Sequence, residues 1–179
     1  FIETNLRAIP ILDYKGAVID CVFVDQVTAH AQTQRLLMIM AGGFGKRMGA
    51  LTESTPKPML QVNGKPMMAH IIEQAAREHF EKVYIATHYL GHQIQDHFSD
   101  GRKFGVEIDY IEETRPLDTG GSFANIPVSQ GAIVVTNADV LSGVGYSKML
   151  EFHLLNNATV TIAVNQHIIQ HPFGVVRSD

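Results

Sequence analysis

The 179-residue chain is poor in cysteine and in charged side chains, and each shortage excludes a class of protein. Its single cysteine, Cys21, excludes an internal disulfide framework and a cysteine-rich metal site. One cysteine is also typical of a reducing compartment, so we expect a cytoplasmic protein. Only 18% of the residues are charged and 45% are apolar, which excludes a disordered charged tail and provides for a buried core.

Basic excess and long apolar runs are missing as well. Fourteen Lys and Arg stand against 18 Asp and Glu, for a formal net charge of −4, so nucleic-acid binding by bulk charge is not expected. No apolar run approaches the roughly 20 residues that span a bilayer, and the longest, Leu36–Ala41, has the length of a strand. We therefore expect neither nucleic acid nor a membrane as partner, and anionic ligands must be bound by a few local cations and backbone amides.

The order of the predicted elements indicates an α/β fold. Two apolar runs, at 8–13 and 18–25, flank a glycine turn and predict a pair of strands, and the polar stretch 28–34 predicts a linker. From residue 36 on, strand-length runs alternate with helical patterns, as in parallel β-α-β units. The predicted strands are Leu36–Met40, Val83–Thr87, Val106–Ile111, Ala132–Thr136 and Ala158–Asn165, and the predicted helices are one with Pro66 at its first position, Gly91–Phe98 and Tyr146–Asn156.

We expect two of these strands, Leu36–Met40 and Ala132–Thr136, to be buried, because their apolar runs are continuous. In such sheets ligands bind outside the carboxyl ends of the strands. The glycine-rich loop 42–49 and the segment 137–139 both fall there.

The glycine-rich loop, AGGFGKRMG from Ala41 to Gly49, fails two phosphate-binding templates. Met48 stands where the dinucleotide fingerprint needs its third glycine, and Arg47 stands where a P-loop needs Ser or Thr. A third possibility is a loop that wraps a nucleoside triphosphate with its backbone while Arg47 reaches the phosphates. Taken alone, the loop fits equally well a tight strand-to-helix turn with a solvated Lys-Arg pair.

Lys57 favours the triphosphate-binding interpretation of the loop over the simple turn. Pro56 and Pro58 bracket this lysine and stiffen the backbone on both sides. A lysine in such a brace is typical of a side chain held at a site. A glycine-rich loop, an arginine and a braced lysine ten residues later form a far more specific pattern than any of the three alone.

The run AGGFGKRMGALTESTPKPMLQVNGKPMMAHII resembles the opening signature of the sugar-phosphate nucleotidyltransferases. The resemblance covers 36–179, with YLGHQIQDHF, GRKFGVEIDYIEE, RPLDTGGS, TNAD and HPFGVV in the family's order. It implies a Rossmann-like fold with a mixed, mostly parallel sheet flanked by helices, here truncated. The segment before it resembles the tail of a CBS domain, so we expect a CBS tail at 1–27, a linker at 28–34 and part of a nucleotidyltransferase domain at 35–179.

The resemblance implies transfer of a nucleotidyl group from a nucleoside triphosphate to a sugar 1-phosphate, with release of pyrophosphate. The likeness is to the guanylyltransferase-like branch acting on hexose or hexosamine 1-phosphates, which favours GTP, and to fusions that make activated sugars for surface glycans. Arg47 and Lys57 match the family's catalytic cations, which position and neutralise phosphates. Asp139 matches the aspartate that holds Mg²⁺, the expected cofactor.

The resemblance also assigns a binding surface. Glu113, after Glu112, can accept hydrogen bonds from guanine, although a solvated acidic pair at a loop edge explains these residues equally well. Two positions depart from the family pattern: Asp118 replaces a glycine, and the methyl of Ala138, also at a glycine position, is expected to crowd the nucleotide. The implied nucleotide-binding residues are Ala41, Gly42, Gly43, Gly45, Lys46, Glu113, Thr119, Gly120 and Asn137, and the implied sugar-binding residues are Gly121 and Gly174.

Alternatives stay open at the level of the sequence. The chain begins at Phe1 and ends in a strand-like stretch, and the family's later lysine and second metal-binding aspartate would follow Asp179, so we expect a piece that is weakly active by itself. A non-catalytic sugar-nucleotide sensor is the second hypothesis, and a dinucleotide-dependent oxidoreductase is disfavoured by the failed fingerprint. His88 and His92 lack an evident third ligand, so a zinc site is not expected. The base, the sugar and the oligomeric state are undetermined, and a homo-oligomer is permitted.

Overall fold

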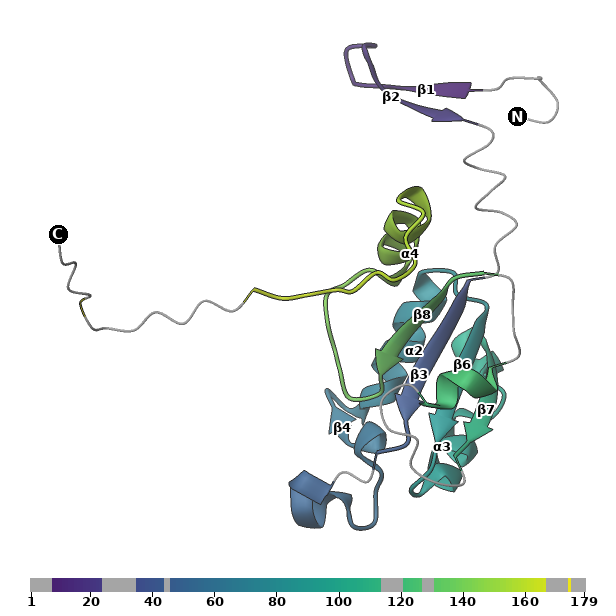
Figure 1. The fold of residues 1–179 in the computed structure, drawn as a ribbon, viewed down its shortest axis with the longest axis vertical. Helices are drawn as coiled ribbons and strands as arrows, with labels where there is room; N and C mark the ends of the chain where they lie inside the picture. Colours follow the sequence, from purple (N-terminus) through teal and green to yellow (C-terminus); the bar gives the residue numbers. More distant parts are fainter. Residues whose placement is uncertain are drawn as a thin grey trace.

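The computed structural model of the chain describes residues 8–23, 35–43, 46–113, 121–126, 131–166 and 174. Within these residues lie a four-stranded sheet, a two-stranded N-terminal hairpin and a small two-stranded ribbon (Figure 1). The predicted linker 28–34 lies outside the described residues.

The main sheet is parallel throughout its described part and has the order β7-β6-β3-β8. β3 (Leu36–Ala41) lies inside the sheet and pairs with β6 (Lys82–Thr87) on one side and with β8 (Ile133–Asn137) on the other. β7 (Glu107–Glu112) forms the other edge beside β6. Because the strands pair in parallel and nearly in register, their carboxyl ends lie along one edge of the sheet, toward which the arrowheads point in Figure 1.

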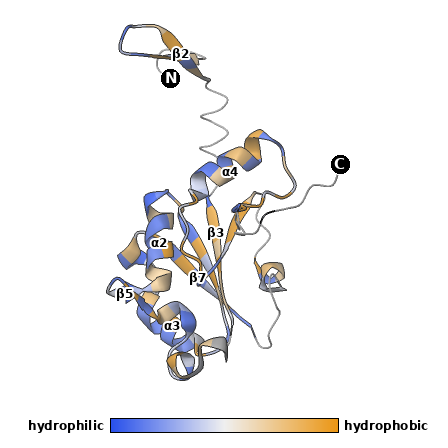
Figure 2. Cartoon of the chain, turned by 90° about the vertical axis from the view of Figure 1, so that its left-hand side faces the viewer, coloured by the Kyte–Doolittle hydropathy of each residue, from blue (hydrophilic) through white to orange (hydrophobic). Residues whose placement is uncertain are grey.

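Three helices contribute to the apolar cluster on one face of the sheet. α2 (Met67–Arg77) contributes buried residues at helical spacing, and α3 (Gly91–Phe98) and α4 (Tyr146–Leu155) add to the same cluster. On the opposite face a smaller cluster includes Ile126, which follows the short 3-10 helix η4 (Gly121–Asn125). Figure 2 shows β3 coloured mainly as hydrophobic and both colours on α2, as expected for a buried central strand beneath an amphipathic helix.

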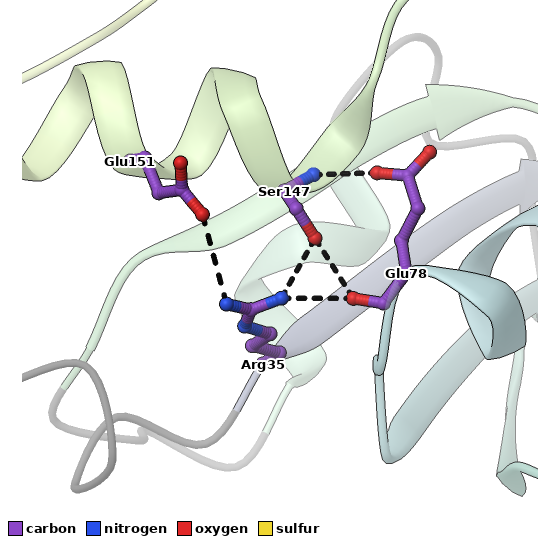
Figure 3. Close-up of polar contacts among 4 residues, drawn as sticks. All are labelled: Arg35, Glu78, Ser147 and Glu151. Atoms are coloured by element: carbon purple, nitrogen blue, oxygen red, sulfur yellow. Dashed lines mark hydrogen bonds and ion pairs between the residues drawn. The ribbon is translucent and has the colours of Figure 1, made fainter. Parts of the chain in front are cut away.

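The amino end of the sheet is fastened by a polar network on Arg35 (Figure 3). Arg35 Nη1 donates to the carbonyl of Glu78 at 2.9 Å and to Ser147 Oγ at 2.8 Å, and Nη2 lies 3.8 Å from a carboxylate oxygen of Glu151. The Glu78 carboxylate accepts from the backbone N–H of Ser147 at 2.7 Å. Gly145, at the N-cap of α4, has no side chain, so Glu78 caps this helix from outside it.

Most of the predicted elements are confirmed, with ends that agree within two residues. The strands near 36, 83 and 106 and the helices near 91 and 146 appear as β3, β6, β7, α3 and α4. The expected all-around burial holds for β3, whose residues divide between the two apolar clusters.

Two expectations about strands are wrong. The strand near 132 appears as β8, but it lies at an edge of the described sheet, and Val135 is 43% exposed. Ala158–Asn165 forms no strand: Val160, Ile162 and Val164 are 72% to 88% exposed, although they alternate along the chain as strand residues do. A strand needs a neighbour for its backbone hydrogen bonds, and no strand in the described part pairs with this segment.

A short ribbon before α2 was not expected. β4 (Gln61–Val62) and β5 (Lys65–Pro66) pair across Asn63 and Gly64, which have positive φ values of 50° and 81°. Asn-Gly is the strongest sequence signal for such a two-residue hairpin turn. Pro66 therefore stands one residue before the helix, as its N-cap, and not at its first position.

The N-terminal hairpin consists of β1 (Ala8–Leu12) and β2 (Val18–Phe23), paired antiparallel. Asp13 Oδ1 accepts from the backbone N–H groups of Lys15 and Ala17, and Gly16 takes the left-handed φ of 82° that closes the turn. The predicted pair of strands is confirmed. Its assignment to a CBS tail stays a prediction.

Candidate functional site

The carboxyl edge of the sheet gathers residues from several of the predicted motifs. Ala41 ends β3 and Asn137 ends β8, and the N–H of Ala138 donates to the carbonyl of Met40 at 2.9 Å, which continues the pairing past the last bridge. Glu113 directly follows β7, and its N–H donates to the carbonyl of Thr87 at 2.8 Å. Three residues predicted to bind nucleotide, Ala41, Glu113 and Asn137, thus lie along one edge.

The Glu113 carboxylate lies against the start of the glycine-rich loop. An ideal Cβ on Gly42 would stand 2.7 Å from Glu113 Oε2, so a larger residue at this position would force the Glu113 carboxylate to move. Nothing lies within 4 Å of the corresponding point on Gly43. Glu113 is only 6% exposed, whereas Glu112 is exposed, so the two carboxylates do not form a solvated pair.

Lys57 and Asp139 meet at the same edge, although 82 residues separate them in sequence. Lys57 opens the 3-10 helix η2 (Lys57–Met59), and its proline neighbours Pro56 and Pro58 are both buried. Its Nζ donates to Asp139 Oδ2 in an ion pair, with about a third of each side chain exposed. The structure therefore brings together the predicted phosphate-binding cation and the predicted metal ligand.

The surroundings of Asp139 fit Mg²⁺ bound jointly with a ligand. No group of three or more His, Cys, Asp or Glu that could hold a metal ion occurs among the residues that the structure describes. Mg²⁺ commonly takes one or two carboxylates and completes its shell with phosphate oxygens and water. A single accessible carboxylate at a sheet edge is compatible with that mode of binding.

One of the expectations concerns Ala138. Its methyl group belongs to the apolar core and only 2% of the residue is exposed. The methyl group packs inward, beneath the edge that carries Asn137 and Asp139, and the expected crowding of the nucleotide stays a prediction.

Several predicted residues are not placed with this group. Gly45, Thr119 and Gly120 lie outside the described residues, and no side-chain position is described for Lys46 or Arg47, which open the 3-10 helix η1 (Lys46–Thr52). Gly121 begins η4. Gly174 is exposed, with no atom within 4 Å of its ideal Cβ position, and no contact with the residues of this edge is described for it.

Three side chains at this edge were missed by sequence reasoning. Tyr89 Oη donates to the carbonyl of Glu53 at 2.8 Å, and Gln93 Nε2 donates to the carbonyl of Ser54 at 2.9 Å. His88 Nδ1 lies 2.6 Å from the carbonyl oxygen of Glu113. All three belong to the segment around YLGHQIQDHF, where the only available signal was the resemblance of that motif.

Residues 36–179 match the model of the family described as nucleotidyl transferase. The chain belongs to this family. Mannose-1-phosphate guanylyltransferase from Mycobacterium tuberculosis is 36% identical over 144 residues, which is 79% of this chain and 40% of that protein. N-acetylmuramate alpha-1-phosphate uridylyltransferase from Neisseria meningitidis is 33% identical over 138 residues, 75% of this chain and 59% of that protein.

Among solved structures, HddC from Yersinia pseudotuberculosis complexed with GMP-PN has a TM-score of 0.60 and 27% identity. The match covers 67% of this chain and 54% of that one. The chain thus spans between 40% and 59% of the length of these proteins. Both a guanylyltransferase and a uridylyltransferase are among its relatives, so relatedness alone does not fix the base.

None of the helices in the described part of the chain is long and apolar enough to cross a membrane.

Proposed function

We propose that the protein transfers a nucleotidyl group from a nucleoside triphosphate, GTP in preference, to a hexose or hexosamine 1-phosphate. The observation that carries this proposal is the meeting of Lys57 and Asp139 at the carboxyl edge of the sheet. A protein that binds only neutral sugars needs neither charge there. Family membership and the printed activities of two relatives, guanylyl and uridylyl transfer to sugar phosphates, support the same reaction class.

The proposed reaction is an in-line displacement. A phosphate oxygen of the sugar 1-phosphate attacks the α-phosphorus, a new P–O bond forms, and the bond from the α-phosphorus to the bridging oxygen of the β-phosphate breaks. Pyrophosphate leaves with that electron pair, so no oxidant or reductant takes part. Two anions must approach each other, which makes fixed positive charge the main requirement of the site.

The residues divide this work by position. Arg47, in the glycine-rich segment, would bind the triphosphate and the departing pyrophosphate, because its planar guanidinium suits phosphate oxygens. Lys57 would neutralise the α-phosphate and the sugar phosphate. Neither residue exchanges a proton with the substrate.

Mg²⁺ held by Asp139 and phosphate oxygens would supply further positive charge at the triphosphate. In the structure Lys57 and Asp139 satisfy each other. Ligand binding would replace this ion pair by two new ones, Lys57 with phosphate and Asp139 with the cation. The charges are thereby kept in place, and partly exposed, before substrate arrives.

Glu113 is the proposed determinant of the base. Its buried carboxylate beside Gly42 can accept two hydrogen bonds, from the N1–H and the exocyclic amine of guanine, which uracil cannot supply in the same pattern. Glu113→Gln is expected to lower the ratio of kcat/KM with GTP to that with UTP by about tenfold. Glu112→Gln, the same change on the exposed neighbour, should leave the ratio unchanged, and equal effects of the two variants would remove Glu113 from this role.

The experiment that tests the reaction measures pyrophosphate release by the full-length protein with Mg²⁺. GTP, UTP, dTTP, CTP and ATP would each be offered with a panel of hexose and hexosamine 1-phosphates, and Arg47→Ala would be the control. We expect release with one base and one sugar, lost in the variant. Saturable nucleotide binding without release for any pair would replace the proposal by a sugar-nucleotide sensor.

A role in surface-glycan synthesis, in the cytoplasm, would follow if that product supplies glycosyltransferases. Deletion of the gene is then expected to deplete one nucleotide-sugar pool and to alter the cell-surface glycan that contains this sugar. An unchanged pool would separate the enzyme from that role.

A further inference from the structure

The loop that leads to Lys57 is held at its start by two side chains from one neighbouring segment. Tyr89 and Gln93 donate to consecutive backbone carbonyls, those of Glu53 and Ser54, at 2.8 Å and 2.9 Å. The donors lie 36 and 39 residues further along the chain than their acceptors. The bonds therefore join two segments that the sequence keeps apart.

The donors themselves have fixed positions. They flank the start of α3, where Leu90 has a left-handed φ of 52° and Gly91 is buried against the end of β6. An ideal Cβ on Gly91 would stand 2.9 Å from the Cβ of Thr87, so the helix begins as close to the strand as glycine allows. The burial of Ile94 and Phe98 holds the rest of α3 on the core. The sheet thus determines where Tyr89 and Gln93 lie.

The acceptors are placed where they can control Lys57. Ser54 precedes Lys57 by only three residues, and Pro56 between them has a fixed φ and a buried side chain. After Lys57, buried Pro58 and a hydrogen bond from the N–H of Leu60 to the carbonyl of Lys57 close the short helix η2. Few rotatable bonds therefore separate the two held carbonyls from the lysine side chain.

We propose that Tyr89 and Gln93 are positioning residues for Lys57: they hold the loop 53–56 on α3 so that the ammonium group stays at the carboxyl edge, in reach of Asp139 and of a bound phosphate. The proposal rests on the proposed function for its catalytic consequence. Both side chains donate hydrogen bonds to backbone carbonyls, so these bonds do not depend on the side chains of Glu53 and Ser54. Both bonds lie at the surface, so removing them leaves the core intact.

The test uses the full-length protein with Tyr89→Phe and Gln93→Met, each made alone. Two variants are needed because Tyr89 also makes a further interaction, which its own variant could disturb. Gln95→Met, the same replacement on the same helix, is the matched control. Each variant is also combined with Lys57→Ala, and the melting temperature is recorded throughout.

Pyrophosphate release gives the first readout. Tyr89→Phe and Gln93→Met, the two clamp variants, are each expected to lower kcat by about 10-fold to 100-fold. A small misplacement of a charged group produces an effect of this size. In the Lys57→Ala background the same replacements should have no further effect, because the residue they position is gone. A loss that persists in that background, no loss at all in an active enzyme, or an equal loss in Gln95→Met would overturn the proposal.

Hydrogen exchange of the backbone amides in 51–58 gives the second readout and needs no activity. Both clamp variants should exchange faster in this stretch than the wild type and Gln95→Met. If the wild-type protein releases no pyrophosphate with any substrate pair, the proposed function fails while faster exchange still supports the clamp. Unchanged exchange overturns the clamp whatever the activity.

Discussion

The two ends of the parallel sheet use charged groups differently. At the amino end, Arg35, Glu78 and Ser147 bond to one another and tie β3, the end of α2 and the start of α4 together (Figure 3). At the carboxyl edge, Lys57 at the start of η2 and Asp139 just after β8 form a partly exposed ion pair. The first arrangement combines several groups from three elements, whereas the second leaves its charges within reach of solvent.

This difference separates a structural role from a binding role. Several mutual hydrogen bonds, including bonds to main-chain groups at helix ends, are typical of a network that stabilises the fold. An exposed ion pair contributes little to stability because water and salt screen it. The pair at the carboxyl edge is therefore better explained by ligand binding, in which Lys57 and Asp139 would give up their ion pair for contacts to a ligand. Mutations at the carboxyl edge should lower activity, and mutations at the amino end should lower stability.

The largest effect is expected for Lys57→Ala. Loss of a preorganised cation that meets developing phosphate charge commonly lowers kcat by roughly 100-fold to 1,000-fold, whereas the melting temperature should hardly change because the ion pair is exposed. Steady-state pyrophosphate release and thermal unfolding of the full-length protein measure the two quantities. Lys103→Ala removes the same charge from an exposed position on η3 (Arg102–Phe104) and should retain wild-type activity. A comparable loss of kcat in both lysine variants would mean that Lys57 has no specific role at the site.

Gly42→Ala should affect both stability and binding. The added methyl would stand 2.7 Å from Glu113 Oε2, so either the buried carboxylate or the loop must move. We expect a loss of about 1–3 kcal/mol in the free energy of unfolding and weaker nucleotide binding, measured by denaturant unfolding and calorimetry. Gly43→Ala, where the methyl meets nothing within 4 Å, is the control. Adding Glu113→Ala should restore the stability of the Gly42 variant, and failure of this rescue would argue against the contact.

Glu78→Ala should affect stability alone. It removes the carboxylate that caps the backbone N–H of Ser147, and loss of an N-cap costs about 1 kcal/mol, up to about 2. Denaturant unfolding should show this decrease while KM for the nucleotide stays the same. Glu81→Ala, at an exposed position three residues on, provides the comparison. A large change in KM would show that the amino end is coupled to the site and that the contrast between the two ends is too simple.

Local patterns were sufficient for most of the fold. Leu36–Met40 reads as a buried strand because every residue is apolar, and Gly91–Phe98 reads as a helix because its apolar residues recur at helical spacing. Ala158–Asn165 carries an equally good strand pattern, yet it forms no strand in the structure. This segment shows that alternation predicts a tendency, while a strand also requires a partner strand that pairs with its backbone.

For the site, the sequence identified residue types and the structure supplied their neighbours. Glu113 was ambiguous between a base-binding group and a solvated acid, and its burial against Gly42 excluded the second. Tyr89 and Gln93 could not be found from the sequence, because a donor for a backbone carbonyl carries no distinctive pattern. The side chain of Arg47 has no described position, so its role still rests on the motif.

The sequence by itself determined most of the strands and helices, the glycine-rich loop and the braced lysine, because each depends on residues that are close along the chain. The tertiary structure alone decided that Lys57 meets Asp139, that Glu113 fills the space left by Gly42, and that Glu78 caps α4. The residues in these contacts are between 69 and 82 positions apart in the sequence. The sequence separation of Gly42 and Glu113 is comparable. These contacts form because of how the strands pair in parallel and where the helices pack on the sheet. The periodicity of a single segment predicts neither of these.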